Sequence, residues 1–89
     1  MTVEFDPGKR DKTLLERGHD FARAEEMFAG RVYTARDERK DYPKPRFVSM
    51  GRLDGRMIVM VWTPTRRGRR IISMRKANER EQAKYGALV

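Results

Sequence analysis

The feature that most constrains the fold is an uninterrupted apolar run, MIVMVW at residues 57–62, in a chain of 89 residues of which 38% are charged. The run is far shorter than the ~20 residues that a membrane-spanning helix needs. A continuously apolar segment of this length is typical of a strand that is covered on both faces. Asp54-Gly55 is a strong hairpin signal that joins the run to a preceding strand-like segment, RFVSMGRL. The sequence therefore predicts a sheet with residues 57–62 in a central strand.

A first helix is predicted near the start of the chain. Asp6-Pro7 is typical of an N-cap followed by proline at the first helical position, and Gly18 is typical of a residue that ends a helix. We expect the helix between them to turn Leu14 and Leu15 toward the core.

Two further helices are expected. Asp20 begins FARAEEMF, whose apolar residues fall on one stripe: Phe21, Ala24 and Phe28, with Met27 beside it. Asn78, with Glu81 three residues later, predicts a capping box at the start of a short polar helix, NEREQAKY.

The remaining segments complete an α+β pattern. TVEF, RVYTA and RRIISMR have strand character, and residues 36–45, which are charged and contain two prolines, are predicted to form a loop. Helices and strands that do not alternate along the chain indicate an α+β fold. We expect an antiparallel meander sheet with two N-terminal helices packed on it and a short C-terminal helix, in a single domain over residues 1–89.

Regular pleating of RRIISMR predicts which of its side chains share a face. Arg70, Ile72 and Met74 would lie on one side of the strand, and Ile71, Ser73 and Arg75 on the other. The strand would bury its middle and present arginines at its ends.

The distribution of charge favours an anionic partner. Lys and Arg total 21 against 13 acidic residues, a formal net charge of +8, and residues 55–78 contain no acidic residue. A one-sided basic surface is typical of nucleic-acid binding. The alternative is a solvated surface that only keeps the protein soluble.

Composition also excludes several kinds of site. There is no cysteine and one histidine, so disulfides, thiol nucleophiles and cysteine-type zinc sites are ruled out, and we expect neither a metal nor a cofactor. No signal peptide is visible at the N-terminus. We expect a soluble cytoplasmic protein without a membrane partner.

Several segments together resemble a known family. They are FDPGK, G-x-DF ahead of the second helix, R-F-x-x-x-G, DGRMIVMVWT and, most specifically, RRIISMRKANEREQAKY. From Val3 to Tyr85 the chain is similar to the BrnT toxins of bacterial type II toxin–antitoxin modules. Family members commonly read N-x-x-K-H-G between the first two helices, whereas this chain has Thr13 and Arg17 at the corresponding asparagine and histidine positions, and its only histidine is His19.

The resemblance implies a RelE/ParE-like fold and a metal-independent ribonuclease that arrests growth. It also implies a BrnA-like antitoxin, with which the protein would form a hetero-oligomer. The motif residues that it marks in this chain are Arg70, Ile71, Ile72, Ser73, Arg75, Ala77, Glu81 and Tyr85.

Cleavage of RNA without a metal requires cations that stabilise a dianionic phosphorane, and the planar fork of arginine can hold two phosphate oxygens. Arg75, Arg70 and Arg46 are the candidates, with Arg75 first. The alternative for Arg75 is a structural pair with Glu81. For RNA binding, the candidates are Arg66, Arg67, Arg69 and Lys76.

Candidates for proton transfer are Lys12, His19, Glu81 and Tyr85, and each has a structural alternative. Lys12 and His19 would otherwise be surface or capping residues, Glu81 would cap the last helix, and Tyr85 would pack that helix on the sheet. Two other functions stay open: a basic module that binds nucleic acid without cleaving it, and a degenerate toxin that only binds its antitoxin.

Overall fold

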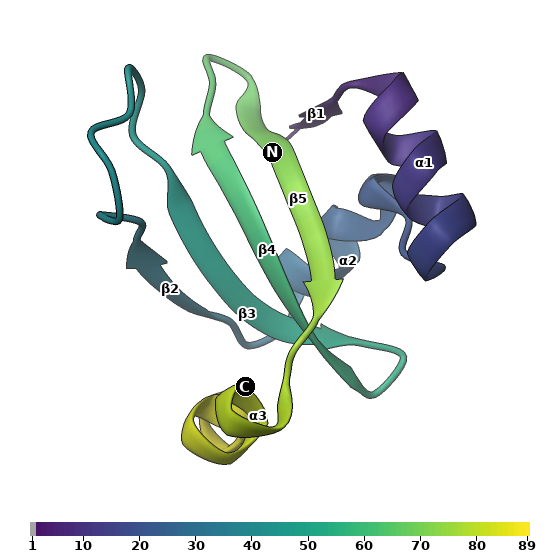
Figure 1. Cartoon of the computed structure of the whole chain (residues 1–89), viewed down its shortest axis with the longest axis vertical. Coiled ribbons are helices and arrows are strands. Elements are labelled where there is room, and N and C mark those ends of the chain that lie inside the picture. The colour runs from purple at the N-terminus through teal and green to yellow at the C-terminus, as the bar shows by residue number, and fades with distance from the viewer. Residues whose placement is uncertain (1) are drawn as a thin grey trace.

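The computed structural model describes residues 2–89, and Figure 1 shows one sheet with helices behind it, to its right and at its lower end. In chain order the elements are β1 (Thr2–Phe5), α1 (Pro7–Arg17), a 3-10 turn (Phe21–Arg23), α2 (Ala24–Ala29), β2 (Tyr33–Arg36), β3 (Phe47–Leu53), β4 (Arg56–Pro64), β5 (Gly68–Lys76), α3 (Glu79–Tyr85) and a final 3-10 turn (Gly86–Leu88).

The five strands lie in the order β1-β5-β4-β3-β2, so β4 is central, as the apolar run predicts. From β2 to β5 the sheet is an antiparallel meander. The prediction of a purely antiparallel sheet is wrong at β1, which pairs with β5 in parallel. No hairpin joins these two strands, so no local turn sets their relative direction.

One face of the sheet packs against α2 and the turn before it, behind the sheet in Figure 1. The buried residues of this layer are Phe21, Ala24, Met27, Ile58, Met60, Ile71 and Met74. The stripe predicted for the second helix is thus confirmed for Phe21 and Ala24, while Met27 is buried and Phe28 only half-buried. Phe28 meets the ring of Trp62 edge-on, with 5.7 Å between the ring centroids.

Helix α1 has the predicted ends but not the predicted inner face. The Asp6 side chain accepts a hydrogen bond from the Gly8 N–H (2.9 Å), and Gly18 adopts the left-handed conformation with φ 73°. Leu14 and Leu15, expected to face the core, are 39% and 88% exposed. No residue of α1 is buried, so apolar packing contributes little to holding this helix in place.

A β-bulge changes the side-chain pattern of β5. The register shifts between Val61 and Trp62 of β4, which pair with Ser73 and Ile71. The predicted strict alternation is therefore wrong, because Ile72 is the extra residue. Ile71 and Met74 both face the helix layer.

The same bulge brings three polar side chains of β5 to the other face. Arg70, Ser73 and Arg75 pair with Thr63, Val61 and Val59, which alternate along β4 and so lie on one side of the sheet. We call this side the open face.

Helix α3 covers only one end of the open face. Its packing cluster consists of Met50, Met57, Val59 and Ala77 with the half-buried Val48, Tyr85 and Val89. The predicted capping box is confirmed: the Asn78 side chain accepts from the Glu81 N–H (2.8 Å), and the Glu81 side chain accepts from the Asn78 N–H (2.9 Å).

We expect Gly51→Ala to lower the free energy of unfolding by about 1–3 kcal/mol, because β3 passes close beneath α2. A Cβ atom at Gly51 would lie 2.7 Å from Met27 Cγ and 3.0 Å from Val32 Cγ1, inside a packed layer. Urea denaturation measures the change. Gly30→Ala is the control, because its Cβ would meet only the Met27 carbonyl oxygen at 3.6 Å. Equal stability of the two variants would contradict the close approach.

Candidate active site

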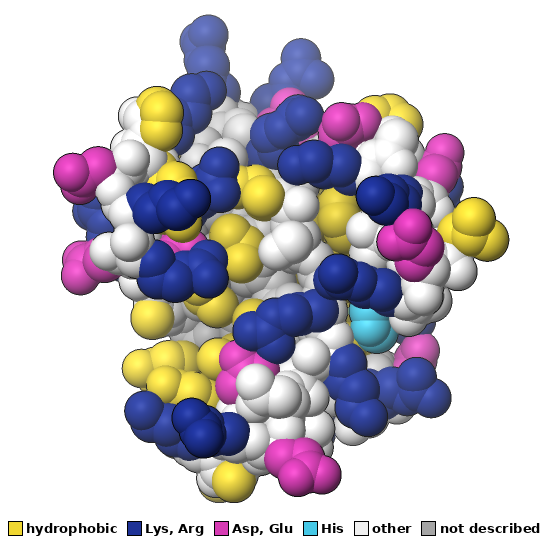
Figure 2. Space-filling model, viewed as in Figure 1, with side chains coloured by type: hydrophobic (Ala, Val, Ile, Leu, Met, Phe, Trp, Pro, Cys, Tyr) yellow, Lys and Arg dark blue, Asp and Glu magenta, His cyan; other side chains and the backbone are white. Residues whose placement is uncertain are grey.

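The open face carries a groove of about 420 Å³ between α3, β2 and the loop after β2. Its floor is formed by apolar residues of the sheet, Ala35, Val48, Met50, Val59 and Val61. Charged and aromatic residues line its sides: Tyr33, Arg36, Asp37, Glu38, Arg39, Arg75, Glu81 and Tyr85, with Ser73 beside them. Figure 2 shows apolar side chains in the middle of this face with Lys and Arg around them. We call it the Arg75 groove.

Arg75 is held in place by Glu81. Its Nη1 and Nη2 donate to the two carboxylate oxygens of Glu81 at 2.7 and 2.8 Å, and Nη1 also lies 3.4 Å from the Lys76 carbonyl oxygen. Among the described residues no acceptor is found for the Nε–H of Arg75. Glu81 therefore orients the edge of the guanidinium that is formed by Nη1 and Nη2, which we call the outer edge. The inner edge, formed by the Nε–H and the second proton of Nη2, is free to bind another group.

The ion pair also shifts the pKa values of both Arg75 and Glu81. The hydrogen bond from Arg75 lowers the pKa of Glu81, although partial burial of that carboxyl opposes the shift. The pKa of Arg75 is raised by the same hydrogen bond and lowered less by burial and by the nearby charge of Arg39. Both groups are thus charged near neutral pH, and the effect of Arg39 indicates that a second guanidinium acts on the same groove.

Two tyrosines border the groove next to α3. The rings of Tyr33 in β2 and Tyr85 in α3 are stacked, with 5.2 Å between centroids and 28° between planes. The packing alternative for Tyr85 is therefore present in the structure. The stacked pair also gives the groove an aromatic edge.

The loop after β2 is organised around a buried carboxylate. The Asp37 side chain is 1% exposed and accepts from Arg39 Nε and Nη2 at 2.8 and 2.7 Å. Tyr42 donates its hydroxyl to the same carboxylate at 3.3 Å, and the Asp37 N–H donates to the Arg46 carbonyl oxygen at 2.8 Å. The hydrogen bonds from Arg39 outweigh the effect of burial and lower the pKa of Asp37 to about 2.

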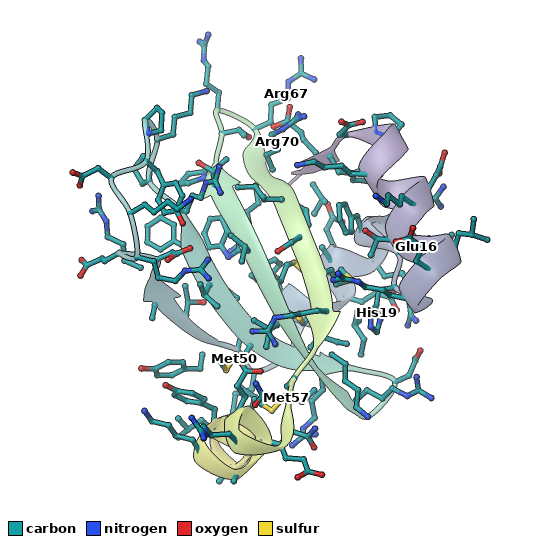
Figure 3. All side chains as sticks on the ribbon, in the orientation of Figure 1. Glu16, His19, Met50, Met57, Arg67 and Arg70 are labelled. Carbon is teal, nitrogen blue, oxygen red and sulfur yellow. The ribbon has the colours of Figure 1, made fainter. Side chains whose placement is uncertain are left out.

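Of the seven residues predicted to act in catalysis, the structure brings three together in this groove, Arg75, Glu81 and Tyr85. Arg70 lies farther along β5, in a second groove with Arg66 and Arg67 at the β4–β5 turn. Figure 3 shows Arg67 and Arg70 at one end of the sheet, and Met50 and Met57 at the other end beside α3.

Three other predicted catalytic residues lie elsewhere. The Arg46 guanidinium stacks over the Tyr42 ring at 4.2 Å. Lys12 borders a small groove between α1 and β5, together with Phe21 and Ile72.

His19 lies after α1, where burial, Arg56 and Arg17 lower the pKa of its imidazole. It lines a different groove, together with Leu14, Arg23 and Asp54.

Two of the predicted RNA-binding residues have distinct surroundings. The Arg69 guanidinium lies 3.9 Å from the Phe28 ring centroid and 4.9 Å from that of Trp62, and its Nε is buried. Arg69 therefore packs on the helix side of the sheet. Lys76 is exposed at the end of β5 next to Arg75.

Sequence reasoning missed Tyr33, Arg36 and Arg39 as groove residues. They lie in β2 and the loop after it, far in sequence from Arg75, and reach the groove because β2 pairs with β3 from Tyr33↔Met50 to Arg36↔Phe47. The only available signal was the alternation of RVYTA, which predicts a strand but not its neighbour.

Within the described part of the chain, no group of three or more His, Cys, Asp or Glu side chains could hold a metal ion. None of the described helices is long and apolar enough to cross a membrane.

Comparison with protein families identifies the chain. Residues 5–81 match the family model described as the ribonuclease toxin, BrnT, of type II toxin–antitoxin systems. The chain belongs to the BrnT family. A search of curated proteins finds no match. The matched region includes Arg75 and Glu81 and ends before Tyr85.

We expect Asp37→Asn to destabilise this BrnT toxin by about 1–2 kcal/mol at neutral pH. The effect is modest because Arg39 is 73% exposed, so water screens its attraction to Asp37. The native pKa of Asp37, about 2, lies below the ordinary 3.8, so its contribution is complete above pH 3.8 and is lost as the pH falls through about 2. The difference between wild type and variant, measured by urea denaturation, should shrink over that range.

Asp41→Asn is the matched control, because Asp41 is an exposed carboxylate in the same loop. If Asp41→Asn were as destabilising as Asp37→Asn, the buried carboxylate of Asp37 would not be what organises the loop.

Proposed function

We propose that this BrnT protein is a metal-independent endoribonuclease toxin, a single RelE/ParE-like domain that acts in the cytoplasm. In the reaction, a ribose 2′-OH passes its proton to a solvent water while its oxygen attacks the adjacent phosphorus. A 2′,3′-cyclic phosphate forms, and the 5′-oxygen leaves with a proton. The observation that carries the proposal is the oriented fork of Arg75, with one edge free, beside a groove with an apolar floor.

Arg75 suits the stabilisation of the phosphorane. Its inner edge presents two N–H donors, and a planar pair of donors matches two phosphate oxygens. Because Glu81 already holds the outer edge, the fork needs little reorganisation when charge develops on the phosphate.

Glu81 is better suited to positioning than to proton abstraction. Its carboxylate accepts two hydrogen bonds from Arg75 and one from the Asn78 N–H, and its pKa is lowered. A carboxylate stabilised in its ionised form is a weak base near neutral pH. We therefore assign Glu81 to holding Arg75 and to starting α3.

The rest of the groove fits a nucleotide. The apolar floor and the stacked Tyr33 and Tyr85 offer surfaces for an unpaired base. Arg39 lies on the side of the groove formed by the loop after β2, where it can contact a phosphate next to the scissile one. Tyr85 carries a phenolic hydroxyl at the edge of the groove formed by α3 and is our candidate to donate the proton to the leaving oxygen.

We expect Arg75→Ala to reduce RNA cleavage in EDTA about 10²–10³-fold, because one preorganised donor group is lost. Arg75→Lys should restore little activity, since a lysine keeps the charge but not the fork. The assay follows cleavage and the formation of 2′,3′-cyclic phosphate ends, with circular dichroism to check folding. Arg80→Ala, which removes an exposed arginine in α3, is the control and should cleave normally.

Several outcomes would separate this proposal from its rivals. Cleavage that disappears in EDTA would contradict metal independence. Tight binding of RNA that stays intact would instead indicate a binding module, and a chain that neither binds nor cuts RNA would fit a degenerate toxin.

We further propose that a BrnA-like antitoxin neutralises the toxin by covering the open face with an acidic segment. Expression of the toxin should arrest growth, and co-expression of the antitoxin from the neighbouring reading frame should relieve the arrest. Because the contact would be between opposite charges, the affinity of the purified complex should fall as salt increases. Complex formation that is indifferent to salt would contradict a charge-driven contact, and expression without arrest would contradict the toxin role.

A further inference from the structure

A second groove lies at the opposite end of β5 from α3, with a volume of about 1340 Å³. It is lined by Glu4, Lys44, Pro45, Thr63, Pro64, Thr65, Arg66, Arg67 and Arg70. These residues come from β1, the loop before β3, the end of β4, the β4–β5 turn and β5 itself. We call it the Arg70 groove.

The charge balance of the Arg70 groove differs from that of the Arg75 groove. Four cations line the Arg70 groove against one carboxylate, that of Glu4. The Arg75 groove has three arginines against three carboxylates, and two of these arginines, Arg75 and Arg39, are ion-paired. Among the described residues, none of the four cations of the Arg70 groove lies within 4.0 Å of a carboxylate. Net positive potential is therefore concentrated away from the proposed catalytic arginine.

The loop that contributes Lys44 is fixed at this place by hydrogen bonds. Thr63 Oγ1 donates to the Pro45 carbonyl oxygen at 2.6 Å, and the Asp37 N–H bonds the Arg46 carbonyl oxygen at 2.8 Å. At the β4–β5 turn, the Thr65 side chain accepts from the Gly68 N–H at 3.1 Å. Both backbone segments that present cations to the groove are thus anchored at their ends.

The two grooves lie on the same face of the sheet. The bulge in β5 puts Arg70 and Arg75 opposite Thr63 and Val59 of β4, which are four residues apart on one side of that strand. At ~3.3 Å per residue, the Cα atoms of Thr63 and Val59 are roughly 13 Å apart, and their partners Arg70 and Arg75 are separated by a similar distance. One chain lying along β5 could therefore reach both arginines.

We infer that the Arg70 groove binds the backbone phosphates of a single-stranded RNA whose scissile nucleotide lies in the Arg75 groove. This inference rests on the proposed ribonuclease function. Lys and Arg that contact phosphates supply affinity without sequence information. The strand must be unpaired because the apolar floor of the Arg75 groove offers contacts to exposed base faces, which stacking and pairing hide in a duplex.

Binding to an uncleavable strand tests the inference without depending on catalysis. The probe is a single-stranded 2′-O-methyl RNA of about twelve nucleotides, compared with one of two nucleotides. We expect Arg66→Ala/Arg67→Ala to weaken binding of the long probe about 10- to 30-fold at 0.1 M salt. The slope of log affinity against log salt should fall by about 1.4, because each phosphate contact on a single strand contributes about 0.7. Binding of the dinucleotide should not change.

The matched control is Arg31→Ala/Arg80→Ala, which removes the same charge from exposed positions outside both grooves. An equal loss in the control would overturn the inference, since the effect would then come from overall charge. An unchanged affinity and slope in Arg66→Ala/Arg67→Ala would also overturn it.

Two further measurements keep the inference independent of these variants and of the proposed chemistry. In the wild type, the salt slope should be steeper for the long probe than for the dinucleotide, and equal slopes would overturn the inference. A duplex of the same length should bind more weakly than the single strand, and tighter duplex binding would overturn the single-strand assignment. If the long probe binds as expected but RNA is never cut, the proposed function fails while the phosphate-binding groove stands.

Discussion

The structure depends on the way β5 separates its apolar and its charged side chains. This strand lies between β1 and β4, so both of its edges are paired and neither can be adjusted freely. Its apolar side chains have to meet α2, while Arg70 and Arg75 have to stay in contact with water, because an unpaired buried charge is very costly. Strict alternation would place Ile71 and Met74 on opposite faces. The bulge at Ile72 lets both enter the core and places Arg70 and Arg75 together on the open face.

A second constraint is that one carboxylate, that of Glu81, serves two elements. It accepts the Asn78 N–H and so closes the first turn of α3, and it also holds the fork of Arg75 in β5. The structural and the functional interpretations of Arg75 are therefore compatible. A free, exposed arginine would lose side-chain entropy on binding a phosphate, whereas Arg75 is already ordered by Glu81 before RNA arrives.

Local signals in the sequence predicted the helices and strands well. Features that depend on contacts between distant segments could not be predicted. The ends of α1, the Asp54-Gly55 turn and the capping box of α3 depend on residues within a few positions of one another, and all of them form as expected. The parallel pairing of β1, the bulge in β5 and the exposure of Leu15 depend on distant neighbours. In the same way, Arg75 and Glu81 could be identified as candidate site residues because both belong to one sequence motif. Arg36 and Arg39 could not be chosen, because only the β2–β3 register brings their segment to the groove.

The separation of the two grooves reconciles two opposite effects of the high positive charge of this chain. A cluster of like charges strengthens phosphate binding, but it also raises the cost of folding through self-repulsion. In this protein the arginines nearest the proposed reaction are paired with carboxylates, so Arg75 and Arg39 can lie close together near neutral charge. The unpaired cations gather at the far end of β5, at exposed positions where water and salt screen their repulsion. Affinity for a polyanion and orientation of a catalytic arginine can thus be supplied by different residues of one small sheet.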